Sequence, residues 1–142
     1  MTIFDIGSSG KSAEVFFNKL KLAKVEKLID IRLNNTSQLS GFTKKNDLKF
    51  FLKEILDVEY VHILDFSPTK EILDNFKKKK ITWDQYEEEY INLLKQRKIK
   101  EKYKEYNFNN CCFLCSEETN ENCHRRLLRD YLFSEEEKKI SL

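Results

Sequence analysis

Four short apolar stretches, each bounded by polar residues, predict buried β-strands in this chain. They are residues 2–7 (TIFDIG), 27–32 (KLIDIR), 59–64 (EYVHIL) and 111–117 (CCFLCSE). Stretches of this length with few polar positions are typical of parallel strands that helices cover on both faces. We therefore expect a mostly parallel sheet of about four strands.

Between and after these strands, apolar residues recur three or four positions apart, the spacing of one face of an α-helix. This spacing predicts helices over residues 12–25, 45–56, 69–80, 82–106 and 123–137. The lysine run at 77–80 is interpreted as a solvated helix face without a function of its own. Strands that alternate with helices predict an α/β fold. We expect a single compact Rossmann-like domain over residues 1–142, with helices on both faces of the sheet.

The composition limits the partners and the compartment. The length of 142 residues suits one domain, and 26 Lys+Arg against 24 Asp+Glu leave a net charge of +2. Binding to nucleic acid through bulk charge is not expected, although a local basic patch stays open. No stretch resembles a signal peptide or approaches the roughly 20 apolar residues that span a bilayer. We therefore expect a cytoplasmic protein with no membrane partner, whose four cysteines are reduced.

The loop after the first strand, GSSGKS at residues 7–12, is a candidate anion site. Ligands of open parallel sheets bind beyond the carboxyl ends of the strands. Backbone N–H groups at Gly7 and Ser9 can bind an anion there, with the dipole of the following helix assisting. The alternative is an ordinary turn in which Ser9 or Ser12 caps that helix. Both interpretations stay open.

The second strand ends in DIR, which places Asp30 and Arg32 on one face. A buried Asp needs a partner, and Arg32 is the nearest candidate. The pair either fixes the following loop or holds an arginine at the edge of the sheet for an anion. The loop itself, with Ser37, is polar and lacks periodicity, which is typical of binding loops on a rigid scaffold. In the third strand, His62 is expected as a hydrogen-bonded core residue.

The four cysteines all lie in the C-terminal stretch NNCCFLCSEETNENCHRRLLRDYL. A zinc site would use Cys112, Cys115, Cys123 and His124, but residues three apart in a strand point to opposite faces. A thioredoxin-like pair needs its C-x-x-C at a strand-to-helix turn, and here that motif lies inside an apolar run. We therefore assign no metal and no cofactor. Cys111 and Cys112 are expected to be small buried side chains.

The interpretation that we prefer treats the cysteine stretch as a strand followed by a helix. Cys115 and Glu117 then emerge at the end of the strand, and Cys123 and His124 point inward from the first turn of the helix. A helix N-terminus with His124 and Arg125 favours an anion. The same positive end lowers the pKa of a nearby thiol, as a nucleophile requires.

Several of these segments together resemble domain-of-unknown-function family 488. They are DIR followed by SQLSGF, YVHIL, the W-x2-Y pair and LCSEETNENCHRRLL, while TIFDIGSS is similar to the T-I-G-x-S opening of that family. The resemblance implies a compact α/β domain and no assigned reaction. It carries over Gly7, Ser9, Asp30, Arg32, Ser37, Gly41, Phe42, Cys115, Glu117, Cys123, His124 and Arg125. The chain departs from the family pattern at Asn35 and Gln38, where a proline and a basic residue are usual.

These observations favour a pocket for an anionic ligand, and three functions stay open. The first is an enzyme acting on a phosphorylated or other anionic substrate, such as a nucleotide or a nucleic-acid component. Cys115 would be the nucleophile or Glu117 the general base, with His124 carrying the proton. The substrate or anion would be bound by Gly7, Ser9, Asp30, Arg32, Ser37, Cys123 and Arg125. The second function is a non-catalytic module that binds a nucleotide or nucleic acid.

The third interpretation is purely structural. An ion pair such as Asp30–Arg125 or Glu117–Arg32 would hold the last helix against the sheet, because buried pairs are costly to break. The sequence leaves the substrate, the oligomeric state and the strand order open.

Overall fold

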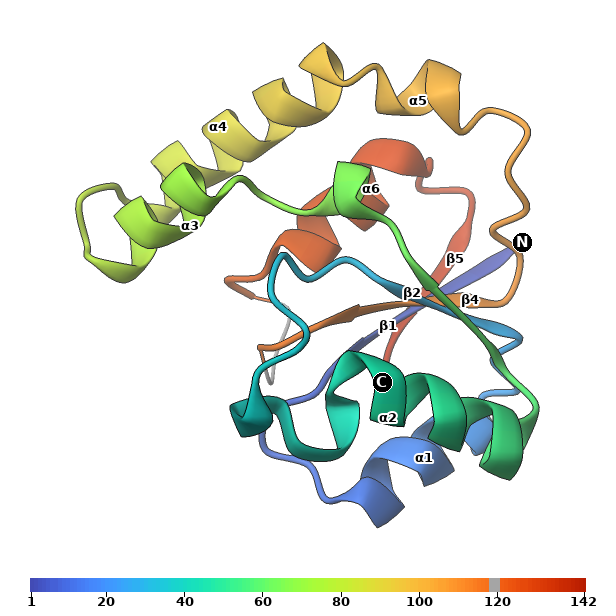
Figure 1. Ribbon diagram of the computed structural model, residues 1–142. Coiled ribbons are helices and arrows are strands. Elements are labelled where there is room, and N and C mark those ends of the chain that lie inside the picture. The colour runs from blue at the N-terminus through green and yellow to red at the C-terminus, as the bar shows by residue number, and fades with distance from the viewer. Residues whose placement is uncertain (118–120) are drawn as a thin grey trace.

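A single parallel sheet organises the protein, as the computed structural model shows for residues 1–117 and 121–142 (Figure 1). Its strands are β1 Thr2–Gly7, β2 Lys27–Asp30, β3 Glu59–His62, β4 Cys111–Cys115 and β5 Lys138–Ser141, in the spatial order β3-β2-β4-β1-β5. Every neighbouring pair is parallel. The α/β fold with four predicted strands is confirmed, and the sheet has a fifth strand, β5, that the sequence did not predict.

In the part of the chain that the structure describes, six α-helices connect or follow the strands. They are α1 Ala13–Leu22, α2 Lys45–Phe51, α3 Lys70–Lys77, α4 Trp83–Gln96, α5 Ile99–Lys102 and α6 His124–Leu132, and α2 continues as the π-helical turn η2 Leu52–Leu56. Short 3-10 turns lie at η1 Gln38–Thr43 and η3 Leu64–Phe66. The helix predicted over 82–106 is interrupted where Lys98 adopts a left-handed conformation (φ 55°). The last helix ends at Leu132 rather than at 137.

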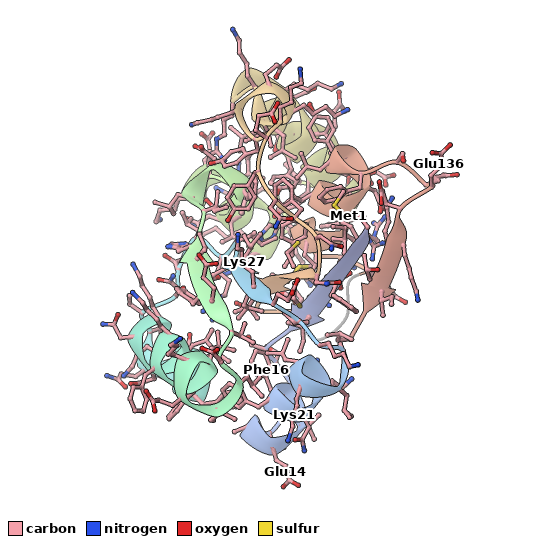
Figure 2. All side chains as sticks on the ribbon, turned by 90° about the vertical axis from the view of Figure 1, so that its right-hand side faces the viewer. Met1, Glu14, Phe16, Lys21, Lys27 and Glu136 are labelled. Carbon is pink, nitrogen blue, oxygen red and sulfur yellow. A yellow bond between two sulfur atoms is a disulfide. The ribbon has the colours of Figure 1, made fainter. Side chains whose placement is uncertain are left out.

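Local sequence explains where the helices begin. Ser12 caps α1 by accepting a hydrogen bond from the Val15 amide at 3.2 Å. Thr82 and Gln85 form a reciprocal capping box at the start of α4. Figure 2 shows the amphipathic result on α1, where Phe16 lies between the helix and the sheet and Glu14 points away from it.

Helices cover both faces of the sheet, as predicted. In Figure 1, α1 and α2 lie on one face, and α3 to α6 lie on the other. Side chains of the central strand β4 alternate between the two layers. Cys111, Phe113 and Cys115 face the α4–α6 side, whereas Cys112 and Leu114 face α1 and α2. This alternation confirms that Cys111 and Cys112 are buried core residues.

The strand order fixes where a site can form. β4 lies between β1 and β2 and leads to α6 on one face, whereas β1 and β2 lead to α1 and α2 on the other. Connections that leave neighbouring strands on opposite faces open a crevice beyond the carboxyl ends of those strands. No helix among residues 1–117 and 121–142 is long and apolar enough to cross a membrane.

Candidate functional site

A pocket of about 470 Å³ lies beyond the carboxyl ends of β2 and β4, where the strand order predicts a crevice. The segments after those two strands, the start of α6, and the α3–α4 hairpin surround it. Five of the ten predicted site residues line it: Arg32, Cys115, Glu117, Cys123 and His124. The other five, Gly7, Ser9, Asp30, Ser37 and Arg125, do not line it, and the roles of all ten residues stay a prediction.

One wall of the pocket is aromatic, and the sequence analysis did not assign it to the site. Trp83 and Tyr86 stack with their ring centroids 4.9 Å apart and their planes 16° from parallel. Phe76 of α3 packs on Tyr86 at 5.2 Å. The W-x2-Y spacing puts both rings on one side of α4, but only the packing of α3 and α4 above the sheet edge brings that side to the pocket.

Two lysines of the run at 77–80 also border the pocket. Lys77 and Lys79 line it, whereas Lys78 and Lys80 do not. Both lining lysines are exposed, and neither has an ion pair with a carboxylate in the part of the chain that the structure describes. The left-handed conformation of Lys79 (φ 58°) ends α3 and changes the direction of the chain at this point. The run is therefore more than a solvated face, because half of it faces a cavity.

Asp30 and Arg32 form the predicted buried pair. Arg32 donates to the Asp30 carboxylate from Nε and Nη2, each at 2.9 Å, and both side chains are almost fully buried. Tyr60 and Asn35 also donate to Oδ2 of Asp30, at 2.6 and 3.2 Å. Nη2 and Nη1 of Arg32 donate to the backbone and the side chain of Thr43, which ties down the end of the loop after β2. Four of the five N–H groups of Arg32 are thus used within the protein.

These contacts set the ionisation of the cluster. Burial acts to raise the pKa of Asp30, but the hydrogen bonds and positive charge of Arg32 and the hydroxyl of Tyr60 lower it below its ordinary value. Burial and the Asp30 carboxylate raise the pKa of Tyr60 well above 10. The pair is therefore ionised and the phenol neutral at physiological pH.

Arg125 has a different partner from those considered in the sequence analysis. Its Nε donates to Oδ1 of Asp5 on β1 at 2.9 Å, and its Nη1 donates to the Glu117 carbonyl and contacts Sγ of Cys115, each at 2.8 Å. Arg129 binds the other oxygen of Asp5 at 2.7 Å. The Asp30–Arg125 and Glu117–Arg32 pairs, named as examples of a structural role, do not form, because Arg125 pairs with Asp5 and Arg32 pairs with Asp30. Arg125 does not line the pocket but fixes the segment behind it.

His124 lies at the start of α6 and points inward, as predicted. Its Nε2 donates to the carbonyl oxygen of Ile31 at 2.8 Å, and its ring packs edge-on against Tyr90. Because a carbonyl only accepts, the proton resides on Nε2 and leaves a lone pair on Nδ1. Burial lowers the pKa of His124 to about 4, so the ring is neutral at pH 7. Nδ1 has no hydrogen-bond partner among the described residues, and His124 lines the pocket.

The cysteines divide into two pairs. Cys115 and Cys123 are joined by a disulfide, which corrects the expectation that all four cysteines are reduced. The fold brings the end of β4 to the start of α6, so two thiols eight residues apart meet. Cys111 and Cys112 are free and buried. Burial raises the pKa of Cys111 to about 12 and raises the pKa of Cys112 well above its ordinary value. A nucleophilic role for Cys115 requires the bond to be reduced and stays a prediction.

The loop after β1 packs against the segment after β4. A Cβ on Gly7 would lie 1.5 Å from the Glu117 carbonyl oxygen, so only glycine permits this approach. The amide of Ser9 donates to the Ser116 carbonyl at 3.0 Å, and Ser12 rather than Ser9 caps α1. These contacts use the loop as a turn, while its role as an anion site stays a prediction.

The remaining predicted residues lie at the edge of this arrangement. Glu117 is exposed and lines the pocket. Ser37 accepts from the Leu39 amide at 3.2 Å and starts the η1 turn without lining the pocket. His62 donates from Nε2 to the Arg32 carbonyl oxygen at 2.8 Å, as a half-buried, hydrogen-bonded residue of the sheet. Within residues 1–117 and 121–142, no three His, Cys, Asp or Glu side chains are grouped to hold a metal ion.

The sequence model of the family described as "Domain of unknown function DUF488" matches residues 12–132. The chain belongs to this family. The match covers every residue that lines the pocket, whereas Gly7 and Ser9, in the loop after β1, lie outside it. No curated protein and no solved structure matches the chain.

Proposed function

We propose that this member of the DUF488 family binds a small anionic molecule that carries a flat apolar group, such as a nucleotide, in the pocket beyond β2 and β4. The observation that carries the proposal is the combination of a stacked aromatic wall and two unpaired lysines around one cavity. The aromatic wall would bind the flat apolar group of the ligand, and the lysines would bind its anionic group.

The aromatic wall suits a planar ring. The buried Tyr86 holds the partly exposed Trp83 ring nearly parallel to its own, so a base that stacks on Trp83 covers apolar surface without rearranging either side chain. Stacking of a base on an aromatic side chain contributes about 1–3 kcal/mol. The pocket volume of about 470 Å³ lies within the range that small-molecule sites occupy.

The cationic edge suits the anionic half. Lys77 and Lys79 contribute two charges. Neither forms an ion pair within the described residues, although Lys77 is close enough to Asp74 to help lower the pKa of that carboxyl, whereas Arg32 is paired with Asp30. The fifth N–H of Arg32 and Nδ1 of His124 offer one donor and one acceptor to a polar group of the ligand. Glu117 is the only acidic residue of the lining in the described part of the chain, which favours an anion over a cation.

Trp83 is the only tryptophan of the chain and makes the proposal directly testable. Trp83 is excited at the red edge of its absorption band. Nucleoside mono- and diphosphates should quench its fluorescence in a saturable way, nucleosides should quench it less, and inorganic phosphate alone should not quench it. Short oligonucleotides should be added in parallel, because saturation by these alone would favour a nucleic-acid module. Absence of saturable quenching by every probe would contradict the proposal.

The lysine run supplies a matched control. Replacing Lys77 and Lys79 by Ala should weaken binding by about 2- to 30-fold, since each exposed charge contributes about 0.2–1 kcal/mol. Replacing Lys78 and Lys80 by Ala removes the same charge from the same run and should leave the affinity unchanged. Equal effects of the two double variants would show that the lysines act through general charge rather than through the pocket.

Catalysis is the second candidate, favoured by the contact between Arg125 and Cys115 beside the pocket. In the reduced protein, Arg125 would stabilise a Cys115 thiolate for attack on an electrophilic ligand, with Glu117 and His124 at the same cavity. Its test is turnover of phosphate and acyl esters by the reduced protein. Activity that survives Cys115→Ser would remove this residue from the mechanism.

A further inference from the structure

The disulfide between Cys115 and Cys123 has features that distinguish it from a simple cross-link. It joins the end of the central strand to the first turn of α6, and both cysteines line the pocket. The two other cysteines lie deeper in the core, where burial raises their pKa values and suppresses thiolate formation. Of the four cysteines, this pair alone combines a bond with contact to a cavity.

Each sulfur of the pair has a group that stabilises negative charge. Nη1 of Arg125 lies 2.8 Å from Sγ of Cys115, and Arg125 is itself held in place by Asp5 and the Glu117 carbonyl. Cys123 is the N-cap of α6, and the first turn of that helix contains no acidic residue, so its amides favour an anion. A disulfide whose two sulfurs are stabilised as thiolates is more easily reduced than one in an apolar core.

From these contacts we infer that Cys115 and Cys123 are a redox-active pair that exchanges with a small thiol entering the pocket. Each cysteine is at most 2% exposed, so the sulfurs are accessible to a small molecule within the cavity and not to the surface of a folded protein. This activity is separate from ligand binding and does not depend on the identity of the ligand.

The exchange proceeds in two steps. The thiolate of a small thiol attacks Sγ of Cys123, the S–S bond breaks, and the electron pair moves to Sγ of Cys115, where Arg125 stabilises it. A second thiolate attacks the sulfur of the bound small thiol, releasing Cys123 and a small-molecule disulfide. Two thiols are thereby oxidised to one disulfide, the protein disulfide is reduced to two thiols, and two protons pass to the protein sulfurs through solvent.

The test uses the intact 142-residue chain, equilibrated in glutathione buffers that run from fully reduced to fully oxidised. Free thiols are trapped with iodoacetamide and each cysteine is quantified by peptide mass spectrometry, while far-UV circular dichroism monitors the fold. We expect Cys115 and Cys123 to pass together between the free and the linked form with the fold unchanged. Cys111 and Cys112 should remain unlabelled in the folded protein.

Two results would overturn the inference. One is a bond that breaks only under conditions in which circular dichroism shows unfolding, as for a structural disulfide. The other is a pair that stays unlinked in the most oxidising buffer. Cys112→Ser is the matched control, because it removes a cysteine that faces away from the pocket and should leave the exchange intact.

A second variant examines the role of Arg125 without altering it. Cys123→Ser leaves Cys115 free beside Arg125, and Cys115 should then react with iodoacetamide at neutral pH at least about tenfold faster than Cys111 of the same chain. Equal rates for Cys115 and Cys111 would contradict thiolate stabilisation at Cys115. If Cys123→Ser fails to fold, the glutathione titration of the wild-type protein still tests the inference by itself.

Discussion

The buried pair of Asp30 and Arg32 should behave as one unit in stability measurements. Asp30→Val leaves the guanidinium of Arg32 in a position that is 3% exposed, with its main partner lost. An uncompensated buried charge of this kind costs about 3–5 kcal/mol. Arg32→Met leaves a buried carboxylate that retains Tyr60 and Asn35, so its cost should lie at the lower end of that range.

The double variant Asp30→Val/Arg32→Met removes both charges together. Asp30→Val alone already leaves the Tyr60 hydroxyl, the Asn35 amide and the backbone N–H of residue 32 without the carboxylate. The double variant adds only the unpaired Thr43 carbonyl, at about 1–3 kcal/mol, while it removes the buried charge. The double variant should therefore lose no more stability than the worse single variant. The two single losses then exceed the double loss by at least about 3 kcal/mol, which is the coupling energy of the pair.

Equilibrium unfolding in urea at pH 7, followed by far-UV circular dichroism, measures all four proteins. The exposed pair of Lys70 and Asp74 in α3 provides a matched cycle, in which the coupling should be close to zero. Additive losses in the buried cycle would refute the reasoning, because they would show that neither residue senses the charge of the other. Repeating the urea unfolding at several pH values tests the direction of the pH dependence. The lowered pKa of Asp30 means that its contribution is present above its ordinary pKa of 3.8 and is lost as the pH falls below it, and Asp30→Val should lack that loss.

Three further predictions concern single positions. Gly7→Ala should lower the free energy of unfolding by at least about 2 kcal/mol, because its Cβ would overlap the Glu117 carbonyl. Gly41→Ala meets no atom within 4 Å but has a φ of 56°, so it should cost only about 1 kcal/mol. Thermal unfolding compares the two variants, and equal losses would contradict the close approach at Gly7. His124 has a folded pKa of about 4 against an ordinary 6.5, so the unfolded chain binds the proton first, and stability should fall by about 3 kcal/mol as the pH drops from 6.5 to 4. His124→Gln should flatten that slope in the same urea series, and an unchanged slope would assign it to other groups. Tyr90→Phe removes the buried hydrogen bond to the Phe66 carbonyl and should cost about 1–2 kcal/mol without weakening nucleotide quenching of Trp83, since Tyr90 does not line the pocket.

Much of the candidate site could be predicted because it depends on short-range pattern. Alternation along a strand put Asp30 beside Arg32, two residues away, and the structure confirms their pair. Helical periodicity directed His124 inward, and it is buried against Tyr90. Such features need only the local periodicity of the backbone, which the order of apolar and polar residues specifies.

The partners of Arg125 could not be obtained in this way. Asp5 lies 120 residues earlier, and the two meet only because β1 pairs with β4 and α6 folds back over their ends. The same holds for the aromatic wall, since the W-x2-Y pair predicts a helix side but not the cavity that this side faces. Residues that meet across the sheet are selected by strand order, and the sequence pattern of each strand is compatible with several orders.

The sequence by itself determined that this protein is an α/β fold with four of its strands, that its polar residues gather at strand ends, and that helices begin close to residues 12 and 82. Which serine caps α1, and the exposure of the strand β3, came only from the structure. The tertiary structure decided the rest: the fifth strand, the disulfide and the pocket. β5 has the polar sequence KKIS, and it is a strand only because the edge of β1 offers it backbone partners. Cys115 and Cys123 are bonded because β4 and α6 converge at one end of the sheet. Local propensity depends on neighbours in the chain, whereas these features depend on neighbours in space.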